Sequence, residues 1–286
     1  MSEFGLKSAI PGLPGAIWTR SMFPLLRHID GQKVAAAAIP AILVLLWQLA
    51  STLKLLDPAI MPSPMDCAIA WKRWIFGGAG GRALDSYNGT WLPSLWNSLD
   101  RVLQGFGIAC LIGIPVGVAI GAIRSAAVVD PTIQMLRPVP ITAWLPFSIA
   151  LFGIDNKSAL FLIALGAFYP IVVSAAQGAR DTNPVLLRAA SMLGASRWTT
   201  LARVVVPSAL PTVFVGLRLG VGAAWTAVVI AEMVSVKSGL GYVLWDAYYL
   251  GRMDIVIAAM VSIGLLGFLS DLLVVALRER VIKWRR

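Results

Sequence analysis

Long apolar runs alternate with short polar segments along most of this chain. Six of the runs are long enough to cross a bilayer, because a spanning helix needs about 20 consecutive residues of mainly apolar character. The pattern therefore predicts an all-α integral membrane protein with six transmembrane helices. The predicted spans cover residues 34–56, 99–123, 133–152, 158–177, 208–234 and 255–277.

The lysine and arginine residues are unevenly distributed between the loops that join these spans. If the chain begins in the cytoplasm, the cytoplasmic side carries twice as many of them as the outer side. Cytoplasmic loops are usually the more basic ones, so we expect both termini to be cytoplasmic. This places a segment 1–33 before the membrane domain 34–277 and a tail 278–286 after it.

Two polar segments interrupt the membrane domain. Segment 57–96 falls on the outer, periplasmic side, and segment 178–207 falls in the cytoplasm. Tryptophan favours the level of the lipid headgroups, so we expect a short helix over 66–76 to lie on the outer interface. The tryptophans of the outer segment are Trp71, Trp74, Trp91 and Trp96.

Small residues recur at four-residue spacing on two of the predicted spans. Such a stripe allows two helices to approach each other closely in lipid. The pattern fits packing inside one subunit as well as a seam between two copies of the chain. The stripes are Gly113, Gly117 and Gly121 in one span and Gly216, Gly220 and Ala224 in another.

The composition agrees with a membrane protein. Of the 286 residues, 58% are hydrophobic and 13% are charged, and the mean hydropathy is +0.79. A soluble domain carries about 25% charged residues. The net charge of +10 does not indicate nucleic-acid binding, because the basic residues alternate with apolar spans instead of forming one patch.

No catalytic or metal-binding constellation is visible in the sequence. His28 is the only histidine, and Cys67 and Cys110 form no CxxC pair. The chain also has no GxxxxGK(S/T) loop, whose backbone and lysine bind nucleotide phosphates. We therefore expect no cofactor and no enzymatic site in this chain. If it uses ATP, another subunit must bind the nucleotide.

The cytoplasmic segment has the local signals of two short helices. Asn183 is placed to cap a helix over 185–193, and Gly194 can end it with a left-handed turn. Ser196 can cap a second helix that continues to Pro207, where we expect the next span to begin.

The first of these helices has the features of a docking element. Ala189 and Ala190 form a nearly flat surface, and Arg188 and Arg197 flank it. A compact helix with a small-residue face suits insertion into a cleft on a partner protein. The alternative is a loop helix that lies on the membrane.

Three motifs carry a resemblance to a known family. They are Ala189-Ala190-x3-Gly194-x9-Val204-x-Val206-Pro207, Arg137-Pro-Val-Pro140-Ile-Thr-Ala-Trp144-Leu-Pro-Phe147 followed by Phe152-Gly153, and Glu232-Met-Val-x4-Gly239-Leu-Gly-Tyr242. Together they resemble ABC importer permeases of the branch that transports nitrate, sulfonates, taurine and bicarbonate. The resemblance covers the chain from about Met61 to the C-terminus. It departs from the family at Arg188, where the first motif usually has a glutamate.

The resemblance implies a type I ABC importer permease fold in the bacterial inner membrane. Two copies would form a homodimer surrounded by membrane lipid, and the loop of each would dock on an ABC ATPase subunit that holds ATP and Mg²⁺. A periplasmic or lipid-anchored substrate-binding protein would deliver a small oxyanion. The loop positions that the resemblance assigns to coupling are Arg188, Ala189, Ala190, Gly194, Arg197 and Pro207.

Four residues within the spans are candidates for the substrate pathway or its gate. Arg137 and Arg218 could form a cationic lining for an anion, or could extend to the cytoplasmic interface as boundary arginines. Trp144 could shape a cavity or belong to the ordinary core. Glu232 fits a gate or a structural hydrogen bond with the turn 239–242.

A stand-alone transporter driven by an ion gradient is the main alternative. Such a protein needs titratable or ion-coordinating groups near the middle of the membrane. The candidate carboxylates here lie near the ends of the predicted spans. They are Asp100, Glu232, Asp254 and Asp271. A membrane-embedded enzyme is a third possibility, but it lacks a recognisable nucleophile or metal set.

Overall fold

The computed structural model describes residues 31–55, 57–77, 87–123 and 125–283, with side chains from Ala38 onward. All regular elements in these residues are helices. The predicted N-terminal segment 1–33 lies outside this range except for its last three residues, and so does the end of the predicted tail 278–286.

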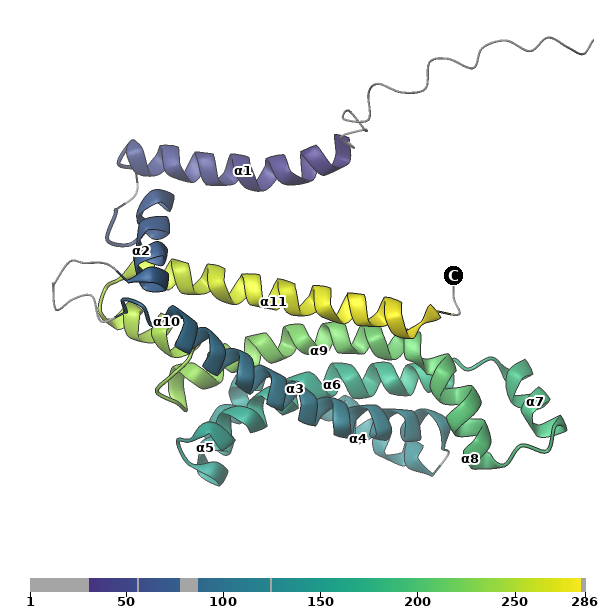
Figure 1. Cartoon of the computed structure of the whole chain (residues 1–286). Helices are drawn as coiled ribbons and strands as arrows, with labels where there is room; N and C mark the ends of the chain where they lie inside the picture. Colours follow the sequence, from purple (N-terminus) through teal and green to yellow (C-terminus); the bar gives the residue numbers. More distant parts are fainter. Residues whose placement is uncertain (1–30, 56, 78–86, 124, 284–286) are drawn as a thin grey trace, which may run out of the picture. The chain divides into compact units, whose positions relative to one another are not determined.

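The helices follow one another as in Figure 1. Their bounds are α1 Gly31–Thr52, α2 Pro64–Phe76, α3 Trp91–Ala122, η1 Ala126–Val129, α4 Asp130–Leu136, η2 Ile141–Trp144, α5 Leu145–Phe152, α6 Asn156–Arg180, α7 Pro184–Met192, α8 Arg197–Thr200, the π-helical η3 Leu201–Val205, α9 Val206–Val234, α10 Leu240–Tyr249 and α11 Met253–Val281.

The chain divides into two compact units, of which the first ends at Leu49 and the second begins at Ala50. The first unit contains most of α1, whose described apolar stretch Ala38–Thr52 is shorter than the predicted span 34–56. The second unit contains all other helices and every site considered below.

Four helical segments in the described residues are long and apolar enough to cross a membrane. They correspond to the second, fourth, fifth and sixth predicted spans, and the bent third span raises the count to five. The chain is therefore a multi-pass membrane protein, but six spans are not confirmed. The four segments are Trp91–Ala122, Asn156–Arg180, Arg197–Val234 and Met253–Val281.

The third predicted span, 133–152, is not one continuous helix. It consists of two parts, Ala126–Leu136 and Ile141–Phe152, which meet at an angle of 98°. Pro138 and Pro140 lie between the two parts. Proline has no N–H to donate and disfavours the helical conformation of the residue before it, so the helix breaks there.

Helix α6 lies in the centre of the second unit, between α3 and α9. The predicted small-residue stripe of α3 faces α6: a Cβ on Gly117 would overlap the carbonyl oxygen of Val172, and one on Gly121 would overlap that of Ala176. These glycines therefore serve packing inside one subunit.

The small-residue stripe of α9 also faces α6. A Cβ on Gly216 would lie 2.5 Å from Cβ of Ser174, and one on Gly220 would lie 2.9 Å from Cγ1 of Ile171. Both stripes thus bring backbones together within the chain, as expected for small residues in lipid. This packing fixes α9 against α6, and α9 carries the candidate site residues Pro207, Arg218 and Glu232.

The predicted outer helix is present as α2. Ser63 caps it, and Asp66 completes a capping box by accepting a hydrogen bond from the Ser63 backbone. Helix α3 begins at Trp91 rather than at residue 99, so its first turns belong to the predicted outer segment 57–96.

Two of the four tryptophans predicted on the outer side form hydrogen bonds within the protein. Trp74 is completely buried, and its Nε1–H donates to Thr90 Oγ1 at 3.1 Å. The Nε1–H of Trp91 donates to Ser262 Oγ of α11 at 3.0 Å. Each of these two indole N–H groups therefore has a hydrogen-bond partner within the fold.

Candidate functional site

The predicted cytoplasmic segment 178–207 forms the two short helices that its caps predict. Asn183 Oδ1 accepts a hydrogen bond from the backbone N–H of Val185 at 2.8 Å and begins α7. Gly194 has a φ of +72°, a left-handed conformation that glycine adopts without strain. Ser196 Oγ then accepts from the N–H of Thr199 at 3.2 Å and begins α8.

The second helix of the segment does not end before the membrane. Helix α9 begins at Val206 with Pro207 in its first turn, close to the predicted start of the span, but no loop precedes it, because the chain is helical from Arg197 to Val234. A proline ring normally clashes with the carbonyl group four residues earlier. The wider π-helical turn at Leu201–Val205, just before Pro207, relieves this clash.

Helix α7 does not present both alanines to the outside. Ala189 is exposed, but Ala190 is only 8% exposed. Leu187, three residues before Ala190, packs against a cluster that includes Val205. Residues three apart share a helix face, so the face with Ala190 is turned toward the protein. Ala189 and Ala190 nevertheless line one groove together, so the predicted two-alanine surface is part of a hollow rather than a fully exposed face.

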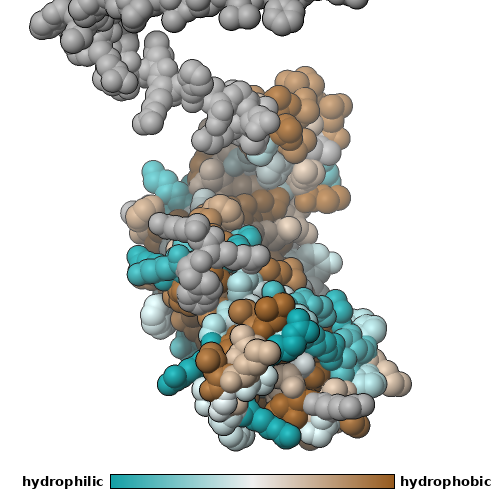
Figure 2. All heavy atoms as spheres, turned by 90° about the vertical axis from the view of Figure 1, so that its right-hand side faces the viewer, coloured by the Kyte–Doolittle hydropathy of each residue, from teal (hydrophilic) through white to brown (hydrophobic). Residues whose placement is uncertain are grey.

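Large apolar side chains dominate the exposed tip of the segment. Met192 is 87% exposed, Leu193 86% and Trp198 77%. Figure 2 views the molecule from this end and shows hydrophobic and hydrophilic residues side by side. Exposed apolar groups in a polar loop are a docking signal that the sequence analysis missed. We call Arg188, Ala189, Met192, Leu193 and Trp198 the α7 tip.

Two grooves border the α7 tip. One of about 420 Å³ is lined by Ala189, Leu193 and Arg203 among others. The other, of about 770 Å³, is lined by Arg197 and Trp198 together with the end of α3. Arg188 and Arg197 are exposed and have no acidic partner among the described residues. The segment thus offers a surface that is both apolar and basic.

A buried ion pair links α3 to α9 at the other end of the rod. Arg101 Nη1 donates to Glu232 Oε1 at 2.7 Å, and Glu232 is completely buried. Ser98 Oγ lies 2.8 Å from both carboxylate oxygens. Buried charges need a partner and hydrogen bonds, and this carboxylate has both. It faces protein, not a water-filled pathway.

The Glu232 carboxylate also holds the segment that follows α9. The backbone N–H of Gly241 donates to Glu232 Oε2 at 2.9 Å, which is the predicted hydrogen bond to the turn 239–242. The N–H of Leu240 donates to Ser98 Oγ at 2.8 Å. Gly239 has a φ of +107°, and a Cβ there would overlap the carboxylate. Only glycine fits this position.

Arg101 uses its remaining donors to tie in two further segments. Its Nε–H donates to Asn156 Oδ1 of α6 at 2.7 Å, and its Nη groups donate to the carbonyl and hydroxyl oxygens of Ser238. Arg101, Ser98 and Asn156 were not predicted as site residues. The sequence did contain one indication, because Arg101 lies within a predicted span, an arginine there requires a partner, and the spans contain few carboxylates.

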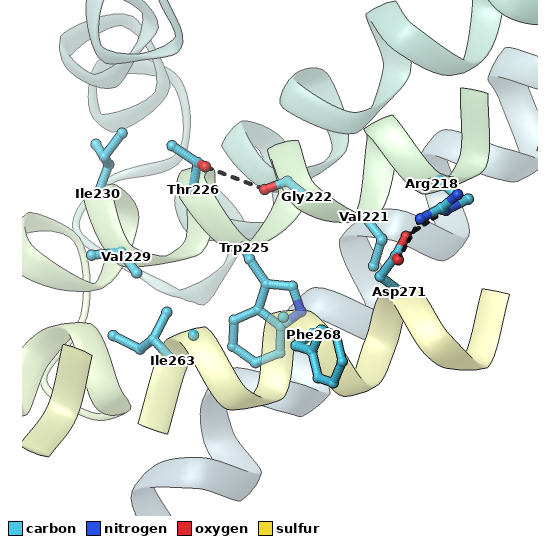
Figure 3. Close-up of a pocket in the computed structure, with 12 residues that line it drawn as sticks. Arg218, Val221, Gly222, Trp225, Thr226, Val229, Ile230, Ile263, Phe268 and Asp271 are labelled. Atoms are coloured by element: carbon cyan, nitrogen blue, oxygen red, sulfur yellow. Dashed lines mark hydrogen bonds and ion pairs between the residues drawn. The ribbon is translucent and has the colours of Figure 1, made fainter. Parts of the chain in front are cut away.

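Arg218 forms an ion pair as well. Its Nε–H and Nη2–H donate to the two carboxylate oxygens of Asp271, each at 2.7 Å. The pair lies at one end of a groove of about 560 Å³ between α9 and α11, with Trp225 and Phe268 along its wall (Figure 3). The positive charge of Arg218 is therefore balanced within the chain.

Arg137 is placed differently. It lies at the break of the bent span and lines a cavity of about 450 Å³ between this break, α6 and α9. Among the described residues it has no hydrogen-bond acceptor or carboxylate within contact distance. Three arginines lie in the predicted spans. Arg101 and Arg218 are paired with carboxylates, whereas Arg137 has no carboxylate partner in the described part of the chain.

Trp144 belongs to the core. Its ring packs beside Ala159, Leu162 and Ala231. It also lies edge-to-face against the ring of Phe147, with 5.9 Å between the two ring centroids. It does not line the cavity of Arg137. Of the two sequence-based interpretations, the structure favours ordinary packing.

A second polar contact joins Tyr87 to α10. The Tyr87 hydroxyl donates to Asp246 Oδ2 of α10 at 2.5 Å. Burial and the neighbouring carboxylate raise the pKa of Tyr87 above its usual range. In the described ranges, no three His, Cys, Asp or Glu side chains lie close enough together to bind a metal ion.

Comparison with known proteins gives a family match over residues 110–283. The matching family is described as the inner membrane component of binding-protein-dependent transport systems. The matched region contains the α7 tip, the cavity of Arg137 and Glu232.

Three relatives extend the similarity. The taurine transport system permease protein of Escherichia coli is 36% identical over 245 residues, 85% of this chain and 87% of that protein. A permease of Bacillus subtilis named for aliphatic sulfonates is 31% identical over 248 residues, 86% of each chain. The bicarbonate transport system permease protein of Synechococcus elongatus is 38% identical over 188 residues, 65% of this chain and 68% of that protein.

Proposed function

Because this chain belongs to the family of inner membrane components of binding-protein-dependent transport systems, we propose that it is the permease subunit of an ATP-driven importer. It translocates a small oxyanion of the nitrate, sulfonate, taurine or bicarbonate type across the inner membrane. The names of its relatives support this substrate class.

The observation that carries the proposal is the combination of the α7 tip with the long rod. The tip exposes Met192, Leu193 and Trp198, an apolar surface that suits a groove on a soluble ATPase subunit. The rod that begins at Arg197 extends without interruption to Val234. A movement imposed on the tip would therefore reach the far end of α9 through a rigid element.

The assembly contains partners that this chain lacks. Two copies of the chain form the pathway within the lipid bilayer, and each tip docks on an ABC ATPase subunit that binds ATP and Mg²⁺. Closure of the ATPases brings the tips together and opens the pathway outward. A periplasmic or lipid-anchored binding protein then delivers the substrate, and hydrolysis resets the inward-facing state. Both termini and the tip are cytoplasmic.

The residues of the coupling loop have unequal roles in this proposal. Arg188, Ala189 and Arg197 contact the ATPase subunit, whereas Ala190 holds α7 to its own chain. Gly194 provides the left-handed turn between the two short helices. Arg188 replaces the glutamate of related loops, so it pairs with an acidic group on the ATPase.

Affinity purification through a tag on this chain tests the proposal. When the chain is produced with the ATPase and binding-protein subunits encoded beside it, we expect a soluble ATPase to co-purify in a one-to-one ratio. Proteoliposomes with this complex should take up radiolabelled substrate only in the presence of ATP and binding protein. Uptake by the chain alone, driven by an ion gradient, would refute the proposal.

The carboxylates argue against a transporter that works alone on an ion gradient. Such a transporter needs a group that can bind and release a coupling ion. Glu232 and Asp271 are ion-paired with arginine, and Asp254 pairs with Arg252. Asp100 accepts a hydrogen bond from Gln104 at 2.7 Å. Each of these four carboxylates therefore already has a partner within the chain and is not a free site for a coupling ion.

A further inference from the structure

Helix α9 separates two hollows that differ in charge. Arg218, Gly222 and Trp225 face the groove toward α11. Leu219, Ala223 and Thr226 face the cavity toward α6 and the broken span, and Thr226 borders both. The second set lies at spacings of four and three residues, which is one helix face. The two hollows can therefore be compared on the same helix.

The groove toward α11 carries no net charge. Its two charged residues are Arg218 and Asp271, and they bind each other through two hydrogen bonds of 2.7 Å. A bidentate pair of this kind satisfies both the guanidinium and the carboxylate. An anion that entered this groove would have to compete with Asp271 for the arginine.

The cavity toward the broken span carries one uncompensated positive charge. Arg137 is the only charged residue in its lining, which contains no aspartate or glutamate. The hydroxyls of Tyr169 and Ser174 also line the cavity, and neither is hydrogen-bonded to another described residue. The hydroxyl of Thr226 is less available as a donor to a ligand, because it already donates to the carbonyl oxygen of Gly222 at 3.2 Å.

The break in the span is a second, independent indication of a ligand. Irregular backbone inside a membrane occurs where it is buried in protein or lines a water-filled cavity. Broken helices frequently form substrate sites in transporters. Here residues 137–140 lie between two helical parts that meet at 98°, and all four line the cavity.

We propose that this cavity is a binding site for a monovalent oxyanion, with Arg137 as its charged ligand and the hydroxyls of Tyr169 and Ser174 as further donors. The inference rests on the proposed function and adds a residue-level site within its pathway. The remaining wall consists mainly of Val139, Ile141, Val173, Leu219 and Ala223 with three prolines and a glycine, so it suits an anion that carries a small apolar group.

The charges of the lining also predict a preference among anions. One arginine without a carboxylate balances a single negative charge. A zwitterion such as taurine would leave its ammonium group without a partner in the cavity, and a dianion would leave one charge uncompensated. An unsubstituted alkanesulfonate or nitrate therefore fits better than taurine or sulfate.

Chemical labelling tests binding without a transport assay. Phenylglyoxal reacts with accessible guanidinium groups, and mass spectrometry can follow each arginine of the complete permease–ATPase complex. At equal ionic strength, we expect sodium methanesulfonate or nitrate to slow the labelling of Arg137. Labelling of Arg280, which is exposed near the end of α11, should not change. Sodium gluconate, whose hydroxyl groups find few partners on this mainly apolar wall, serves as the control anion and should protect neither arginine.

The labelling result can overturn the inference in two ways. If methanesulfonate, nitrate and gluconate affect Arg137 equally, the cavity does not bind the anion. If taurine protects Arg137 as well as methanesulfonate does, the preference for a monovalent anion without a cationic group is wrong.

A second experiment measures uptake by the assembled importer. With saturating binding protein, Arg137→Gln should reduce the maximal uptake rate about 10- to 100-fold, because it removes a charged hydrogen-bond donor. Arg137→Lys keeps the charge and should lose less. The matched control Arg218→Gln/Asp271→Asn removes both charges from the groove toward α11. Its maximal uptake rate should stay within about twofold of the parent, because that pair lies in a separate hollow and should act independently of an anion beside Arg137.

The two proposals fail differently. If the parent importer shows no ATP-dependent uptake of any small oxyanion, the proposed function is wrong. If the parent transports and Arg137→Gln transports equally well, the inferred site is wrong and the proposed function stands.

Discussion

Arg101 Nη1 lies 2.7 Å from Glu232 Oε1, and the two side chains are 9% and 0% exposed. The pair joins α3 to α9 and, through Gly241, to the start of α10. We therefore expect Glu232→Gln to lower the free energy of unfolding by about 3–5 kcal/mol, because it leaves a buried arginine without its counter-charge. Thermal unfolding of the detergent-solubilised protein measures this effect.

A double variant controls for the loss of packing. Arg101→Met/Glu232→Leu removes both charges and should recover part of the stability, since replacing a whole buried pair is less costly than breaking it. Asp271→Asn breaks an ion pair that is 45% and 30% exposed and should have a much smaller effect. A double variant less stable than Glu232→Gln would contradict the role assigned to the pair.

Gly239 should tolerate no side chain. Its φ of +107° is unfavourable for other residues, and a Cβ would overlap the Glu232 carboxylate. We expect Gly239→Ala to destabilise the protein by more than the roughly 1–2 kcal/mol of a left-handed residue alone. Gly153→Ala is the matched control, because Gly153 has a φ of +77° and nothing within 4 Å of a Cβ. Equal losses in the two variants would rule out the contact with Glu232.

Docking of the α7 tip should depend on its exposed apolar residues. Leu193→Glu should abolish co-purification of the ATPase without lowering thermal stability, because Leu193 is 86% exposed. Ala190→Glu should lower stability as well, since Ala190 is buried and a charge there has no partner. Size-exclusion chromatography and thermal unfolding distinguish the two. Retention of the ATPase by Leu193→Glu would show that the tip is not the docking surface.

How much of the fold and of the candidate site could be predicted depends on how far apart the interacting residues lie in the chain. The caps at Asn183 and Ser196 and the turn at Gly194 act within a few residues, so their residue types suffice to predict them. The Arg101–Glu232 pair joins positions 131 residues apart, and no local pattern contains that relation. Hydropathy likewise recognised the apolar character of 133–152 but not its bend.

The same limit applies to the pathway residues. Arg137 and Arg218 look alike in the sequence, since both are single arginines in apolar surroundings. What separates them is Asp271, which lies on another helix and neutralises Arg218. Similarly, only the packing of α7 distinguishes Ala189 from Ala190. Charge balance and burial are tertiary properties, so the structure was needed to assign them.

Tyr87 should make stability depend on alkaline pH. Its pKa is raised in the folded protein by burial and by Asp246, so the folded state binds the phenolic proton more tightly than the unfolded state does. The resulting stabilisation is present below the unfolded pKa of about 10 and is lost as pH rises toward the folded pKa. Unfolding temperatures between neutral pH and pH 11 should therefore fall more steeply for the parent than for Tyr87→Phe. Parallel curves would contradict the coupling of Tyr87 to Asp246.

The close approach of α3 to α6 gives a prediction with a matched pair on one helix. Gly117→Val should destabilise the protein by about 1–3 kcal/mol or more, because the new side chain would overlap the backbone of Val172. Gly107→Val makes the same change on α3 at a position with nothing within 4 Å of a Cβ, so it should be tolerated. Helix propensity and added volume are identical in the two variants, and only the neighbour differs. If both variants unfold at the same temperature, the stripe does not hold α3 to α6.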